Sequence, residues 1–171
     1  MDEETAYIGI GSNLGDREEN CHRAIDEIRR FPKTSVTAVS SLYDTEPLEM
    51  LRQDRFINAV VGVRTGRTPS ELLSDCQNLE KQFGRQRTVP SGPRTLDLDI
   101  LLFGGMRLAS DRLTLPHPKM HLRRFVLTPL AEIAPDALHP VLNLTAAQLL
   151  DRLGDHHSVR RVDAPQTESR E

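Results

Sequence analysis

Two aspartates lie two residues apart in an otherwise apolar segment of the chain, residues 96–103. If the segment is a strand, Asp97 and Asp99 project together from one face, and the other face carries Leu96, Leu98, Ile100 and Leu102. Carboxylates in so apolar a segment are costly unless a divalent cation or nearby arginines meet them. A Mg²⁺ ion held by one or two carboxylates completes its shell with water and phosphate oxygens. The pattern therefore indicates phosphate chemistry. The alternative is that the two aspartates lie on a solvated face or protect an edge strand from pairing with another chain.

Basic residues concentrate around this acidic pair. Between Lys81 and Arg124 there are nine Lys or Arg and three Asp, whereas the rest of the chain carries 13 basic and 22 acidic residues. A basic segment in an otherwise acidic protein favours a focused site for a polyanion. Nucleic acid is the less favoured partner, because aromatic residues make up only 4% of the chain, Trp is absent and no aromatic-rich strand motif is present.

The length of 171 residues fits one domain, which we predict over residues 1–153. Residues 154–171 are polar and aperiodic, so we expect a disordered tail. The acidic N-terminus and the lack of a long apolar stretch predict a cytoplasmic protein with no membrane association. Nothing in the sequence requires oligomerisation, so a monomer is compatible with it. Cys21 and Cys76 occupy apolar positions of helical patterns far apart in the chain, which predicts two buried free thiols.

Apolar periodicity predicts the elements that must position these residues. Strands are expected at residues 5–11, 36–43, 56–64 and around the two aspartates, and helices at 16–31 and 68–84. The second helix has a capping box, Thr68-Pro69-Ser70-Glu71. The order βαββαβ predicts a ferredoxin-like α+β fold, in which helices pack on a mainly antiparallel sheet. Short helices at 125–133 and 145–153 would be C-terminal additions.

Several segments together resemble one family, the 6-hydroxymethyl-7,8-dihydropterin pyrophosphokinases of folate biosynthesis. The matching segments are AYIGIGSNLG (6–15), TEPL (45–48), FINA (56–59), LEKQFGR (79–85), GPRTLDLDI (92–100), LPHP (115–118) and RRFVL (123–127). They recur in the family's order and span residues 6 to about 135. The resemblance implies that the β,γ-pyrophosphoryl group of MgATP moves to the hydroxymethyl oxygen of the pterin and that AMP is released.

The resemblance also implies roles for residues at the phosphate end of the site. Asp97 and Asp99 would hold two Mg²⁺ ions that bridge the ATP phosphates, and Arg85 and Arg94 would clamp those phosphates through their planar guanidinium groups. Glu80 would orient Arg85 rather than touch substrate. The family positions expected around ATP are Gln77, Glu80, Arg87, Ile100 through its backbone, Arg112, Thr114, His117 and Arg123.

For the pterin, the resemblance implies a sandwich of Phe56 and Phe125 around the flat ring, with Asn58 pairing its polar edge. Backbone groups of Thr45, Glu46, Pro47 and Leu48 would complete the pocket. Without the family pattern, a Phe at the start of a strand is better explained by core packing.

The chain departs from the family pattern at three positions, one of them Pro118, where some members have Tyr. Ser91 stands where the family often carries a large residue, and Thr88 stands where a second basic residue is common. These changes predict looser closure of residues 85–92 over the phosphates. We expect this loop and residues 44–55 to close when ATP and pterin are both bound.

Two other functions remain open from the residues themselves. One is a non-catalytic ferredoxin-like module that binds RNA through the basic segment. The other is a Mg²⁺-dependent phosphotransferase that acts on a different small alcohol, for which Phe56, Asn58 and Phe125 would not be needed. Formation of AMP from ATP in the presence of the pterin separates both from the implied reaction.

Overall fold

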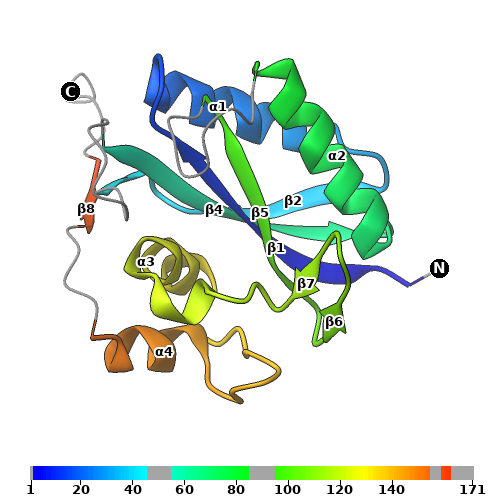
Figure 1. Cartoon of the computed structure of the whole chain (residues 1–171), viewed down its shortest axis with the longest axis vertical. Helices are drawn as coiled ribbons and strands as arrows, with labels where there is room; N and C mark the ends of the chain where they lie inside the picture. Colours follow the sequence, from blue (N-terminus) through cyan, green and yellow to red (C-terminus); the bar gives the residue numbers. More distant parts are fainter. Residues whose placement is uncertain (1, 46–54, 85–94, 155–158, 163–171) are drawn as a thin grey trace.

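A computed structural model of the chain describes residues 2–45, 55–84, 95–154 and 159–162 (Figure 1). Its centre is a six-stranded antiparallel sheet. The strands follow one another in the order β5 (Asp97–Phe103), β1 (Glu4–Ser12), β4 (Phe56–Thr65), β3 (Tyr43–Thr45) and β8 (Val159–Arg161), and β2 (Thr34–Val39) also pairs with β4. The βαββαβ core confirms the predicted ferredoxin-like fold.

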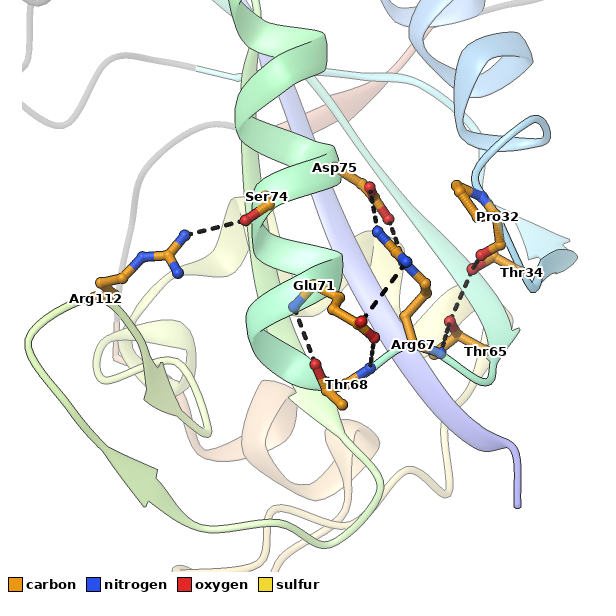
Figure 2. Close-up of polar contacts among 9 residues, drawn as sticks. All are labelled: Pro32, Thr34, Thr65, Arg67, Thr68, Glu71, Ser74, Asp75 and Arg112. Carbon is orange, nitrogen blue, oxygen red and sulfur yellow. Dashed lines mark hydrogen bonds and ion pairs between the residues drawn. The ribbon is translucent and has the colours of Figure 1, made fainter. Parts of the chain in front are cut away.

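Two helices, α1 (Arg17–Ile28) and α2 (Pro69–Gln82), cover one face of the sheet (Figure 1). The predicted capping box begins α2, because the Thr68 hydroxyl accepts from the Glu71 N–H and the Glu71 carboxylate accepts from the Thr68 N–H (Figure 2). Cys21 and Cys76 are buried and free under these helices, as predicted. Burial raises the pKa of the Cys21 thiol to about 12 and also raises that of Cys76.

The opposite face of the sheet is covered by α3 (Arg124–Ile133), which a short 3-10 turn, Met120–Leu122, precedes, and α4 (Ala146–Arg152) packs on α3 (Figure 1). These elements form a second apolar core with Val60, Leu101, Leu102, Leu127 and Leu130. The predicted C-terminal additions thus turn the two-layer unit into a sheet covered on both faces.

The strand that carries the two aspartates contains a β-bulge. Ile100 pairs with Ile8 and Leu102 pairs with Tyr7, so Leu101 is one extra residue on β5. Leu101 and Leu102 both join the core beneath α3, and Phe103 joins the core beneath α1 and α2. The prediction that Leu102 shares a face with Leu96, Leu98 and Ile100 is therefore wrong, because the inserted residue reverses the alternation beyond it.

Three further elements differ from the sequence predictions. The strand predicted at 36–43 is divided into β2 and β3, because Ser40 hydrogen-bonds to Val60 through its N–H and its hydroxyl and interrupts the regular pairing. A small hairpin, β6 (Leu108–Ala109) and β7 (Thr114–Leu115), follows β5, and β7 lies beside it.

The third difference is β8. The prediction of a disordered tail is wrong for Val159–Arg161, which pair with β3 and extend the domain beyond residue 153. The strand depends on the open edge of β3, a tertiary feature that a short polar sequence does not display. The other tail residues, 155–158 and 163–171, lie outside the described residues. No helix in the described part of the chain is long and apolar enough to cross a membrane.

Candidate active site

Three adjacent strands bring polar groups together on the face of the sheet that α3 covers. Gly11 of β1 lies directly opposite Asp97 of β5 on one side and Asn58 of β4 on the other. Gly9 likewise lies opposite Asp99. Paired residues of neighbouring strands project to the same face, so both aspartates and Asn58 share one surface. Asp97 and Asp99 are half-buried, whereas Leu98 between them is 5% exposed.

Glycine at position 11 makes this arrangement possible. A Cβ atom at Gly11 would lie 2.9 Å from Asn58 Oδ1 and 3.7 Å from Phe56 Cδ1. The Asn58 side chain therefore lies across β1, where any larger residue would displace it. Its Nδ2 donates to the Thr45 hydroxyl at 2.6 Å, which fixes the orientation of the amide.

Glu80 of α2 hydrogen-bonds to the backbone between the two aspartates. Its side chain is 4% exposed, and its Oε2 accepts from the Leu98 N–H at 2.7 Å. Leu98 lies between Asp97 and Asp99, so the contact fixes the backbone from which both carboxylates project. The predicted contact of Glu80 with Arg85 lies outside the described residues.

Arg112, in the turn between β6 and β7, rests on one face of α2. Its guanidinium donates to the hydroxyls of Ser70 and Ser74 at 3.0 and 3.3 Å and to Gln77 Oε1 at 3.4 Å. Figure 2 shows its contact with Ser74. Two residues predicted to bind ATP, Gln77 and Arg112, are thus in contact, and the exposed Thr114 begins β7 next to them.

His117 is fixed by two backbone contacts. Its N–H donates to the Leu101 carbonyl at 2.9 Å, and its ring Nδ1 accepts from the Lys119 N–H at 3.2 Å. Because Nδ1 is an acceptor, the neutral ring carries its hydrogen on Nε2, which is free to donate to an anion. Burial, and next the charge of Arg123, lower the pKa of His117 to about 4, while Asp97 acts in the opposite direction. The ring is therefore neutral at pH 7.

Arg123 and Phe125 lie at the start of α3, on the same face of the sheet as the aspartates. The Arg123 guanidinium lies 5.6 Å from the centre of the Phe125 ring. Phe125 and Phe56 are both half-buried, so each phenyl ring retains exposed surface. The described part of the site thus has one end with carboxylates, His117 and Arg123, which is called the phosphate end after the ligand expected there, and an aromatic end with an oriented amide.

The family model for 7,8-dihydro-6-hydroxymethylpterin-pyrophosphokinase matches residues 7–135 of the chain. The chain belongs to this family. It is 46% identical over 128 residues to the 2-amino-4-hydroxy-6-hydroxymethyldihydropteridine pyrophosphokinase of Bacillus subtilis (strain 168), a match that covers 75% of this chain and 77% of the relative. The protein of the same name from Haemophilus influenzae is 40% identical over 156 residues, which cover 91% of this chain and 97% of the relative.

A solved structure of Plasmodium falciparum HPPK-DHPS wild type superimposes with a TM-score of 0.67. The match covers 88% of this chain and 44% of the Plasmodium chain, at 15% sequence identity, so it shows a shared fold.

The structure describes thirteen of the predicted site residues: Thr45, Phe56, Asn58, Gln77, Glu80, Asp97, Asp99, Ile100, Arg112, Thr114, His117, Arg123 and Phe125. It places Asp97, Asp99 and Asn58 on one sheet face and Gln77 against Arg112, whereas the Ile100 side chain lies in the core beneath α1 and α2. Those outside the described residues are Glu46, Pro47, Leu48, Arg85, Arg87 and Arg94, together with Thr88, Ser91 and most of the two loops predicted to close.

Sequence reasoning missed Gly11 as a site residue. Gly9 and Gly11 stand at alternate positions of the strand predicted at residues 5–11. Glycines at alternate positions of a strand indicate a face that another group approaches closely, which is the signal that could have identified the site.

Proposed function

We propose that this chain transfers the pyrophosphoryl group of ATP to the hydroxymethyl oxygen of 6-hydroxymethyl-7,8-dihydropterin, in folate biosynthesis, at the sheet face that carries Asp97 and Asp99. Family membership supports the reaction. The row formed by Asp97, Gly11 and Asn58 supports its location. Because the row spans two strand spacings, Asp97 and Asn58 lie about 10 Å apart in the sheet. A bicyclic pterin with its hydroxymethyl arm fits between a carboxylate and an amide at that separation.

The reaction of the family uses ATP and generally Mg²⁺, and the donor set of this chain fits that ion. Asp97 and Asp99 offer hard oxygen ligands from one face of a strand that Glu80 and β1 hold rigid. Two carboxylates leave most of an octahedral shell to water and phosphate oxygens, as Mg²⁺ prefers. We assign two ions to this pair, whose bound charge would neutralise the phosphates and lower the barrier to pyrophosphoryl transfer.

The residues at the phosphate end then have distinct tasks. His117 donates its Nε2 hydrogen to a phosphate oxygen, since its Nδ1 is occupied and its ring is neutral. Arg123 supplies positive charge beside it, and Arg112 with Gln77 binds the nucleotide near the face of α2. The sequence motif assigns Arg85, Arg87 and Arg94 to the same phosphates.

The pterin lies between the rings of Phe56 and Phe125 in this assignment. The Asn58 amide hydrogen-bonds to the polar edge of the pterin. Its contact with the Thr45 hydroxyl orients the amide for this role, because it prevents free rotation. Backbone groups of Thr45, Glu46, Pro47 and Leu48 complete the pocket. The residues assigned to both ends belong to one chain, so we propose that the monomer is active, which size-exclusion chromatography under assay conditions would check.

The test is to incubate the protein with MgATP and 6-hydroxymethyl-7,8-dihydropterin and to identify the products by chromatography. We expect AMP and the pterin diphosphate in equal amounts, with neither formed when EDTA is added or pterin is omitted. ADP in place of AMP, or AMP formation that does not depend on the pterin, would contradict the proposal.

A further inference from the structure

Helix α3 and strand β3 are joined by a single carboxylate, that of Glu132. Its Oε1 accepts from the Ser41 N–H and from the Tyr43 hydroxyl, both at 2.9 Å, and its Oε2 accepts from the Ser41 hydroxyl at 2.8 Å. Glu132 is exposed and Tyr43 is 8% exposed, and three hydrogen bonds to one carboxylate form a directional contact between segments about 90 residues apart in sequence.

The ionisation states of Glu132 and Tyr43 are consistent with this contact. Burial alone would raise the pKa of Glu132, but the hydrogen bonds from Ser41 and Tyr43 outweigh it and lower the pKa below its ordinary value. Burial, followed by the bond to Glu132, raises the pKa of Tyr43 to about 12. At pH 7 the carboxylate is ionised and the phenol keeps its hydrogen, as the contact requires.

The two segments that Glu132 joins carry opposite walls of the pterin pocket. Phe125 and Glu132 are seven residues apart on α3, so they share one helix face at an axial distance of about 10 Å. On the sheet, Tyr43 lies directly opposite Asn58, and Thr45 lies opposite Phe56. The carboxylate therefore connects the helix that carries Phe125 to the strands that carry Asn58 and Phe56.

Apolar packing alone does not fix the position of α3 relative to strands β3 and β4. Val126, Leu127 and Leu130 bury the inner face of α3 against the sheet. Such contacts are non-directional and tolerate small slides and rolls of a helix. Hydrogen bonds with defined geometry at one end of α3 restrict both movements and so set the position of Phe125 at the other end.

We propose that Glu132 is a positioning residue for pterin binding, which holds Phe125 at the stacking distance from the Asn58 side of the pocket through Ser41 and Tyr43. The inference rests on the proposed function and adds to it three residues that do not touch substrate. Most of the nucleotide end is anchored separately, by the Glu80 carboxylate at the Leu98 N–H of β5 and by Arg112 against Ser70 of α2, and Arg123 is its one residue at the start of α3. Changes at Glu132 should therefore affect the two substrates unequally.

The experiment measures two dissociation constants by titration calorimetry: that of a non-hydrolysable ATP analogue with Mg²⁺, and that of the pterin for protein saturated with this analogue. For Glu132→Ala we expect the pterin constant to rise about tenfold or more, since about 1.4 kcal/mol, roughly one hydrogen bond to a charged group, corresponds to tenfold. The constant for the analogue should change less than twofold. Glu132→Gln, which keeps one acceptor, should recover part of the loss.

Two further variants separate positioning from folding. Tyr43→Phe removes only the phenol hydroxyl, keeps both Ser41 contacts and remains informative if Glu132→Ala does not fold. It should weaken pterin binding, and its effect should not add to that of Glu132→Ala, because the alanine variant has already lost the bond to this hydroxyl. Asp136→Asn changes an exposed carboxylate just beyond α3 and is the matched control, with pterin affinity expected to be unchanged.

An unchanged pterin constant in both Glu132→Ala and Tyr43→Phe would overturn the inference, and so would equal losses for pterin and nucleotide. Failure of the unaltered protein to bind pterin would contradict the proposed function instead, so the two failures are distinguishable.

Discussion

Asp97 and Asp99 are the residues on which the proposed chemistry depends most directly. Their side chains are half-buried at the rim of the site, while the core lies on the other side of the strand. Removing either carboxylate takes away a candidate metal ligand and also relieves repulsion between like charges. The consequences for activity and for stability should therefore diverge.

We predict that Asp97→Ala and Asp99→Ala each lower the rate of AMP formation by a factor of about 100 or more at saturating Mg²⁺, while the melting temperature changes little. Asp111→Ala removes an exposed carboxylate from the turn after β6 and should leave both quantities unchanged. Near-normal activity in either site variant would rule out its carboxylate as an essential metal ligand.

His117 should titrate far below an ordinary histidine. Its pKa is lowered from 6.5 to about 4 in the folded protein. Between these values the unfolded chain binds more protons than the folded one, so stability falls as the pH is lowered through this range. We expect proton NMR of the His117 ring to give a midpoint near 4. Addition of MgATP should raise the midpoint, because nearby phosphates favour the imidazolium form.

The comparison for this prediction is His117→Gln, which should lose less stability than the unaltered protein when the pH falls from 6.5 towards 4. A midpoint close to 6.5 would show that the ring is not buried beside Arg123 as described.

At the level of elements, β1 offers a matched pair of glycines on one face. A Cβ at Gly11 would lie 2.9 Å from Asn58 Oδ1, whereas at Gly9 the nearest atoms are Leu101 methyl groups at 3.6 Å, an ordinary contact. We predict that Gly11→Ala displaces the Asn58 amide and raises KM for the pterin about tenfold, because the pterin would lose about one hydrogen bond to that amide. Gly9→Ala should remain close to the unaltered protein. Steady-state kinetics with each substrate varied would check this, and equal behaviour of the two variants would contradict it.

Elements with local signals were predictable from the sequence. The capping box at Thr68 and the apolar periodicity of α2 located that helix, and the ordered motifs indicated the family and the residues that we propose for both ends of the site. The bulge at Leu101 and the strand β8 were not predictable, since each is specified by the partner strand rather than by its own sequence. Glu132 was missed for the same reason: its partners lie about 90 residues away, and nothing in the local pattern distinguishes it from a solvated helix residue.

For the whole molecule, the two faces of the sheet differ in what they carry. Helices α1 and α2 bury the larger apolar core on one face, and Asp97, Asp99 and Asn58 lie on the other face, which α3 covers (Figure 1). Strand β8 completes the sheet beyond β3, where Arg160 lies 3.8 Å from Asp44 and the Val162 N–H donates to the Leu42 carbonyl. The C-terminal strand thus supports the strand that carries Thr45.

We therefore predict that a chain ending at Gly154 melts a few degrees lower, since about 1 kcal/mol corresponds to roughly 2–4 °C for a protein of this size. Its affinity for the pterin should also fall, because β3 loses its outer neighbour. A chain ending at Val162 retains β8 and is the control. Calorimetric melting and pterin titration of both chains provide the check, and identical behaviour would mean that β8 does not support the pocket.

The outer edge of β5 has one more consequence. The Leu98 N–H donates to the Glu80 carboxylate, and the Leu101 carbonyl accepts from the His117 N–H, so neither backbone group is left bare. A terminal strand with bare backbone groups is a template on which a strand of another molecule can add, and such addition begins aggregation. The contacts that assemble the phosphate end of the site thereby also cover this template. Resistance to aggregation and the phosphate binding that we propose would consequently share these two hydrogen bonds.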